Sequence, residues 1–178
     1  DFSTGSVGLG GAMTIFSSFV QDYLKENILY KNNNNKMISI FGDAELDEGN
    51  IYEALLEGAK HNLKNCWWII DYNRQSLDGI IHGKLFEKII SLFKLMGWNV
   101  EILKYGKKLE GLKKTISGNK ILKWIDDCPN DLFSALTYQG GSEWRNSLNN
   151  SFSTDEEVLS LIKKYNDSDL HSLMTNLA

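Results

Sequence analysis

Apolar residues in the first part of the chain recur at two different spacings. Helical spacing predicts helices over residues 12–30, 50–62 and 84–96. Short, largely apolar segments predict strands over residues 37–41, 66–72 and 98–103. The run at 66–72 is typical of a strand that is buried on both faces. Because helices and strands alternate, we expect an α/β fold with a mostly parallel sheet, flanked by helices and joined by right-handed crossovers.

The pattern changes after residue 106. Shorter amphipathic segments predict helices over residues 107–116, 119–126, 131–137 and 168–176. Residues 139–154 are polar, and a further helix is expected from Asp155 onward, with Thr154 as its N-cap. We therefore assign residues 1–106 to the core of an α/β domain and residues 107–178 to a helical elaboration of the same domain. Because the chain begins in a glycine-rich loop and stops abruptly, we also expect a piece of a longer polypeptide.

Composition narrows the functional classes. The 178 residues are 42% hydrophobic and 24% charged, which is ordinary for a globular protein. A formal net charge of −4 argues against nucleic acid or an anionic membrane as a partner. No apolar run approaches the roughly 18 residues of a membrane span. The two cysteines, Cys66 and Cys128, do not suggest a disulfide framework, so a reducing intracellular compartment is expected, either the cytoplasm or the mitochondrial matrix.

Two polar segments directly follow two of the predicted strands. Asp43 comes after the strand at 37–41, and Asn73 comes after the strand at 66–72, thirty positions later (73 − 43). Open α/β sheets bind ligands at the carboxyl ends of their strands, so both side chains are expected at one edge. A carboxylate, a carboxamide oxygen and a nearby backbone carbonyl, that of Gln75, suit Mg²⁺, which takes its other ligands from phosphate and water. The pattern predicts a metal clamp for a diphosphate.

Four other interpretations compete for these segments. A dinucleotide-binding fingerprint needs a preceding strand, and a glycine or alanine where Met13 stands. A calcium loop that starts at Asp43 needs glycine at the position of Glu48 and glutamate at that of Ala54. A carboxylate pair for glycoside hydrolysis stays open, because it needs only two acids, although nothing in the sequence positions a sugar. Three acids of the loop also fit a purely structural role as caps of the next helix: Glu45, Asp47 and Glu48.

Several segments together carry a family resemblance. They are residues 6–10 (SVGLG), 42–48 (GDAELDE), 71–79 (DYNRQSLDG) and 97–100 (GWNV), with 138–145 (YQGGSEWR) further on. The first four cover roughly residues 3–105 in the right order and at compatible spacing. They resemble the thiamine diphosphate-dependent 2-oxo acid dehydrogenases of the transketolase-like superfamily, and most closely the homodimeric type of pyruvate dehydrogenase, the decarboxylating component. The glycines of residues 5–11 would let the backbone approach a ligand closely.

This resemblance implies roles for particular residues. Asp43, Asn73 and the Gln75 carbonyl would bind Mg²⁺. Other residues would contact or lie along the cofactor: Gly42, Ala44, Glu45, Leu77 and Val7. The family usually has glycine at the position of Ala44, and alanine is tolerated there if its φ is negative. No catalytic residue is expected in this chain, because the glutamate that activates the aminopyrimidine of the cofactor belongs to a second domain, usually of a partner subunit.

The resemblance also implies an activity. Pyruvate or a related 2-oxo acid would be oxidatively decarboxylated with thiamine diphosphate and Mg²⁺, and the acyl group would pass to a lipoyl-bearing acyltransferase in a multienzyme complex. We expect a homodimer, and little activity from this chain alone. Two alternatives stay open: a non-catalytic assembly subunit that retains the fold, and a split transketolase-like subunit that acts on sugar phosphates.

Two further features allow more than one interpretation. His82 lies in a loop shortly after Leu77, Asp78 and Gly79, where it either contacts the substrate or has no role. A basic cluster is either a solvated face or a docking patch for an acidic or lipoyl-bearing partner: Lys104, Lys107, Lys108, Lys113 and Lys114.

Overall fold

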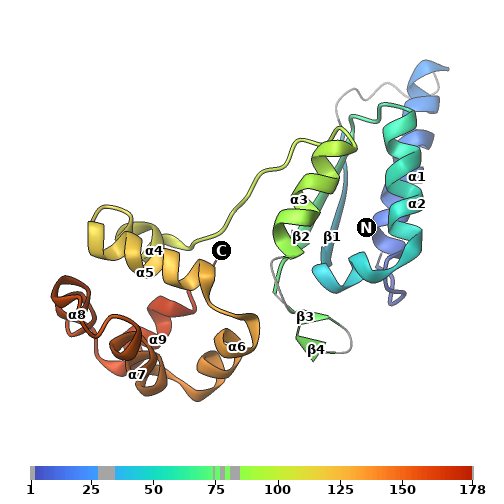
Figure 1. Ribbon diagram of the computed structural model, residues 1–178. Helices are drawn as coiled ribbons and strands as arrows, with labels where there is room; N and C mark the ends of the chain where they lie inside the picture. Colours follow the sequence, from blue (N-terminus) through green and yellow to red (C-terminus); the bar gives the residue numbers. More distant parts are fainter. Residues whose placement is uncertain (1–2, 28–34, 74, 77–78, 81–84, 178) are drawn as a thin grey trace. The chain divides into compact units, whose positions relative to one another are not determined.

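The computed structural model describes residues 3–27, 35–73, 75–76, 79–80 and 85–177 (Figure 1). Internal contacts divide the chain into two compact units, residues 1–100 and residues 101–178, which we call the α/β unit and the helical unit. The boundary at residue 106 and the assignment of both parts to one domain stay predictions.

The α/β unit contains the predicted alternation of helices and strands. Its elements are α1 (Leu9–Glu26), β1 (Met37–Gly42), the 3-10 helix η1 (Asp43–Asp47), α2 (Gly49–Lys60), β2 (Cys66–Asp71), β3 (Gln75–Ser76), β4 (Gly79–Ile80) and α3 (Leu85–Leu95). The α/β fold with a parallel sheet flanked by helices is thereby confirmed. Residues 28–30 of the first predicted helix lie outside the described residues. The loop expected at 73–83 instead contains the antiparallel pair β3–β4.

Strands β1 and β2 form a parallel pair, in register from Met37 opposite Cys66 to Gly42 opposite Asp71. Side chains of one face pack against α1, α2 and α3, and Trp68 lies at the centre of this core. Its ring centroid is 5.3 Å from that of Phe41. Its indole N–H donates to the Thr14 hydroxyl at 2.9 Å, so the polar end of this half-buried ring is satisfied as well.

The opposite face of the sheet is largely exposed, which corrects the expectation that β2 is buried on both faces. Four of its side chains are at least half exposed: Ile38, Ile40, Trp67 and Ile69. Successive residues of a strand point to opposite faces, and within the described residues the helices pack on the face that carries Trp68. Trp67 and Trp68 therefore face opposite sides of the sheet, and only Trp68 joins the core.

The third predicted strand, at 98–103, is absent from the structure as described. Trp98 and Val100 are half-buried and pack on the core beside α3, whereas Leu103 is 85% exposed. Strands require a hydrogen-bonded neighbour, and among the described residues β1 and β2 pair only with each other. The apolar residues of this segment therefore reflect packing on the core beside α3.

In its described residues, 101–177, the helical unit comprises six short helices. They are α4 (Lys107–Leu112), α5 (Ile116–Asp127), α6 (Asn130–Gln139), α7 (Gly141–Ser151), α8 (Glu156–Ile162) and α9 (Asp167–Met174). They enclose one core around the fully buried Trp144, and the Tyr105–Leu177 bridge joins the two ends of the unit. No helix that the structure describes combines the length and the apolar character needed to cross a membrane.

The helical unit contains one helix that was not predicted and one N-cap that differs from the prediction. The polar stretch at 139–154 contains α7, because Trp144 and Leu148, one turn apart, supply enough burial to hold an otherwise polar helix. The N-cap of α8 is Asp155 rather than Thr154, since the Asp155 carboxylate accepts the Val158 N–H at 3.2 Å.

Candidate metal and diphosphate site

The pairing of β1 with β2 brings two predicted ligands to one edge of the sheet. Gly42, the last residue of β1, lies opposite Asp71, the last residue of β2. Asp43 follows Gly42 directly, and Asn73 comes two residues after Asp71. The sheet therefore presents a carboxylate and a carboxamide beyond neighbouring parallel strand ends, where α/β folds bind their ligands (Figure 1).

Asp43 and Asn73 differ in their exposure. Asp43 is the first residue of η1 and is only 3% exposed, whereas Asn73 is exposed. Burial strengthens the interaction of a carboxylate with a cation, because water screens it less. Strand β3 lies against η1, so the backbone of Gln75 is close to the element that Asp43 begins. Oxygen donors of these three kinds fit Mg²⁺.

Among the described residues, no group of three or more His, Cys, Asp or Glu side chains is arranged to hold a metal. A magnesium ion bound here would take its remaining ligands from phosphate oxygens and water. The residues present fit a metal that is shared with a diphosphate better than a metal held by protein alone.

Ala44, where the resembled family has glycine, is compatible with its backbone. Among the described non-glycine residues, only Asn62 has a positive φ, of 51°. Ala44 therefore does not occupy the left-handed region in which a Cβ is costly. The extra methyl group lies in η1, at a half-buried position. The backbone conformation at Ala44 is therefore compatible with binding of a diphosphate by this loop.

A hydrogen bond connects the glycine-rich loop with η1. The backbone N–H of Gly8 donates to Oε2 of Glu45 at 2.9 Å. Gly8 is the N-cap of α1 and has a φ of 80°, a conformation that favours glycine. Sequence reasoning missed this contact, because its two partners are 37 residues apart and neither segment signals the other.

A second contact that the sequence did not reveal fixes the end of η1. The hydroxyl of Tyr52, on the first turns of α2, donates to the backbone carbonyl of Leu46 at 2.5 Å. Burial, and then the nearby negative charge of Asp47, raise the pKa of the Tyr52 hydroxyl above its ordinary value. Tyr52 therefore stays protonated and keeps this donor over the neutral pH range.

The other residues expected at the cofactor are partly outside the described chain. Val7 is half-buried in the loop before Gly8. Leu77 and His82 lie outside the described residues. His61 is exposed at the carboxyl end of α2, the end opposite to η1, and its ring meets that of Phe19 edge-on.

Two lysines of the basic cluster form ion pairs within the helical unit. Lys104 pairs with Asp126 at 2.8 Å, and Lys113 pairs with Glu110 at 2.6 Å. The ammonium groups of Lys104 and Lys113 also lie 5.7 Å and 5.2 Å from the ring centroid of Tyr105. These contacts favour the interpretation as a solvated, internally paired face.

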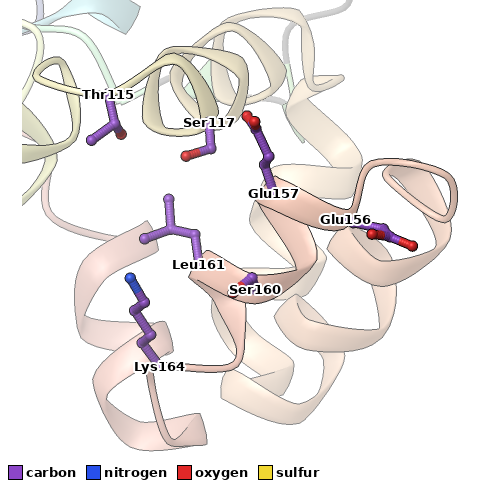
Figure 2. Close-up of a pocket in the computed structure, with 7 residues that line it drawn as sticks. All are labelled: Thr115, Ser117, Glu156, Glu157, Ser160, Leu161 and Lys164. Carbon is purple, nitrogen blue, oxygen red and sulfur yellow. The ribbon is translucent and has the colours of Figure 1, made fainter.

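The helical unit also has an open depression of about 480 Å³, between the start of α5 and α8 (Figure 2). Thr115 and Ser117 line one side, and Leu161 extends into the space from α8. The remaining lining residues carry two carboxylates, a hydroxyl and an ammonium group: Glu156, Glu157, Ser160 and Lys164. None of the residues expected to bind the cofactor contributes to it.

Comparison with known proteins identifies the class. Residues 1–125 match the family described as transketolase, thiamine diphosphate binding domain. The match extends over most of the chain and includes the glycine-rich loop, Asp43 and Asn73. The chain belongs to this family of thiamine diphosphate-binding domains.

Three relatives show which members of the family this chain is similar to. The chain is 30% identical to the pyruvate dehydrogenase E1 component of Buchnera aphidicola subsp. Baizongia pistaciae, over 97% of this chain and 19% of that protein. It is 27% identical to the protein of the same name from Cupriavidus necator and 24% identical to that from Escherichia coli K12, with the same coverage of both chains. The chain thus spans about a fifth of the length of the relatives it matches. The resemblance drawn from the motifs is confirmed.

Proposed function

We propose that this chain supplies the diphosphate- and magnesium-binding part of a thiamine diphosphate enzyme that oxidatively decarboxylates pyruvate or a related 2-oxo acid and transfers the acyl group to a lipoyl carrier. The observation that carries the proposal is the register of β1 and β2, which brings Asp43 and Asn73 to one sheet edge within a thiamine diphosphate-binding domain. The names of the relatives support the choice of reaction.

Each proposed ligand has a distinct task. The Asp43 carboxylate, the Asn73 carboxamide oxygen and the Gln75 carbonyl would hold Mg²⁺, which neutralises and orients the diphosphate. The backbone from Gly42 to Glu45 would run along the diphosphate, and Val7 and Leu77 would contact the cofactor. Thiamine diphosphate, when bound, supplies the carbanion chemistry. The chain's own residues bind and orient it.

Activity on this proposal requires more than this chain. A second domain or subunit would supply the activating glutamate, and the assembled enzyme would be a homodimer in a multienzyme complex with a lipoyl-bearing acyltransferase. We propose an intracellular location, in the cytoplasm or the mitochondrial matrix. These statements rest on the family and on the names of its members, because the chain spans about a fifth of those relatives.

The first test is a calorimetric titration of thiamine diphosphate into the purified protein, together with its natural continuation or partner, with and without Mg²⁺. We expect binding that depends on Mg²⁺. Asp43→Asn should weaken it by at least about 100-fold, because even residues that only support metal ligands change metal affinity by about 10- to 100-fold. Asp47→Asn, the same change at an exposed position of η1, is the matched control.

The outcomes separate the candidate functions. Equal affinity of the Asp43→Asn variant and the wild type would remove the metal clamp. Absence of Mg²⁺-dependent binding in a folded, assembled sample would favour a non-catalytic assembly subunit. Binding accompanied by turnover of sugar phosphates in place of 2-oxo acids would favour a transketolase-like subunit.

A further inference from the structure

Glu45 has an unexpected neighbour. On the family resemblance it should lie along the diphosphate, yet its Oε2 accepts the backbone N–H of Gly8 at 2.9 Å. Charged acceptors form stronger hydrogen bonds than neutral ones, and this contact is partly buried. The bond joins the loop before α1 to the 3-10 helix that begins with Asp43. The glycine-rich loop and η1, which would enclose the diphosphate, are therefore joined by a hydrogen bond between protein groups.

The fit around Gly8 is close. A Cβ atom at this position would lie 2.5 Å from Oδ1 of Asn50 and 2.7 Å from Cβ of Glu48. At distances this short a side chain at position 8 would force its neighbours to move, and the φ of 80° makes a substitution strained as well. Gly8 thus packs directly on the segment that follows η1, and the Glu45 hydrogen bond holds it there.

Electrostatics separate Glu45 from the diphosphate. A carboxylate and a diphosphate are both anionic, and like charges at contact distance repel. A backbone N–H has one proton to donate, so Gly8 N–H cannot serve Glu45 and a phosphate oxygen equally well. While the Glu45 contact persists, the diphosphate must find its partners elsewhere, in the metal and in other backbone groups.

We propose that Glu45 is a positioning residue, whose carboxylate holds Gly8 and the start of α1 against η1 and contacts no atom of the cofactor. This inference rests on the proposed function, because the geometry it preserves is that of the thiamine diphosphate site. The hydrogen-bond acceptor at position 45 matters on this view, and the negative charge matters less.

Three variants test the inference in the assembled protein. Glu45→Gln keeps a side-chain oxygen that can accept from Gly8, Glu45→Ala removes it, and Glu53→Ala removes an exposed carboxylate from α2 as the matched control. Amide deuterium exchange at Gly8 reports the hydrogen bond directly. The dissociation constant of thiamine diphosphate at saturating Mg²⁺ reports its consequence, and circular dichroism verifies folding of each variant.

We expect Glu45→Ala to speed exchange at Gly8 and to weaken cofactor binding about tenfold, since a hydrogen bond to a charged acceptor is lost. Glu45→Gln should stay within about threefold of the wild type in both measurements, a residual difference that a small change in acceptor strength explains. Glu53→Ala should change neither quantity. A larger effect of Glu45→Ala than of Glu45→Gln would show that Glu45 acts through its hydrogen bond, because both variants remove the charge.

Three results would overturn the inference. The first is wild-type exchange at Gly8 in Glu45→Ala. The second is unchanged or tighter cofactor binding in Glu45→Ala, which would make Glu45 a source of repulsion. The third is equal impairment of Glu45→Gln and Glu45→Ala, which would indicate that the charge acts directly. If the wild type binds Mg²⁺ and the cofactor while Glu45→Ala matches it, only the positioning role fails. If the wild type does not bind, the proposed function fails, and exchange at Gly8 still decides whether the contact exists.

Discussion

The helical unit and the α/β unit differ in how completely their large apolar side chains are buried. In the helical unit the large side chains converge on one cluster around Trp144, and its exposed apolar residues are scattered along the sequence. In the α/β unit the buried clusters are smaller, and two rows of large side chains meet solvent. One row is the outer face of the sheet. The other runs along α1 at spacings of four and three residues: Leu9, Met13, Phe16, Val20 and Tyr23.

This contrast suggests that the helical unit contributes mainly to stability and that the α/β unit contributes to binding. Contiguous exposed apolar surface is unusual for a domain that acts alone, and the unit that has it also carries the candidate cofactor site. The helical unit encloses most of its large apolar side chains in one core and contributes no predicted ligand. Substitutions in the helical core should therefore lower the free energy of unfolding, whereas substitutions on the outer sheet face should leave it nearly unchanged.

The largest effect is expected at Trp144. Its side chain is fully buried, and its ring lies 5.3 Å from Phe133 and 6.0 Å from Trp124, centroid to centroid. Trp144→Ala should lower the free energy of unfolding by about 3–5 kcal/mol, as is usual for removal of a buried aromatic ring. Urea denaturation followed by circular dichroism measures this. Tyr138→Ala, at a position 94% exposed in the same unit, should change it by less than about 0.5 kcal/mol and serves as the control.

Arg145, next to Trp144, should have a smaller effect than Trp144. Its guanidinium donates to Asp167 Oδ1 at 2.6 Å, to the Tyr165 carbonyl at 2.6 Å and to the Ile162 carbonyl at 3.3 Å. Arg145→Met keeps most of the length of the side chain but leaves these acceptors without their donor, and should cost about 1.5–3 kcal/mol in the same assay. Arg145→Lys should fall between wild type and Met. An unchanged urea midpoint for Met would show that water replaces the guanidinium fully.

Sequence reasoning succeeded where the signal is local. Asp43 and Asn73 each stand directly after an apolar run, so their approach follows from parallel pairing alone. It failed where structure depends on distant partners. Nothing near Gly8 or Glu45 announces their hydrogen bond, and the run at 98–103 has the alternation of a strand without a neighbouring strand to pair with among the described residues. Helix α7 was missed because two buried side chains outweigh its average polarity.

A smaller, pH-dependent effect is expected at Asp155, whose carboxylate pairs with Lys120 at 2.5 Å and caps α8. The hydrogen bond from Lys120, and then that from the Val158 N–H, lower the pKa of Asp155 below its ordinary 3.8. A lowered pKa in the folded state means that the stabilisation is complete above pH 3.8 and is lost as the pH falls through the folded-state value.

Asp155→Asn tests this, because asparagine keeps the cap but loses the charge. The urea midpoint of the variant should lie below that of the wild type at neutral pH, and the two should converge in acid. High salt should shrink the difference as well, since exposed ion pairs are screened. If the difference in urea midpoint persists below the folded-state pKa of Asp155, the cause would be the geometry of the cap and not the charge.

The smallest effect should come from Ile40, which is adjacent to Phe41 on β1 but points to the other face. Ile40 is 74% exposed and Phe41 is 5% exposed. Ile40→Thr retains β-branching, which suits a strand, and should change the free energy of unfolding by less than about 0.5 kcal/mol. Phe41→Ala, on the same strand, should cost about 3–5 kcal/mol because it empties a site in the core. If Ile40→Thr destabilises the purified protein comparably to Phe41→Ala, the outer face of the sheet is covered in solution, and the contrast between the two units would not hold. Equal sedimentation of wild type and Ile40→Thr, together with an unchanged urea midpoint, is the result expected of a solvent-facing side chain.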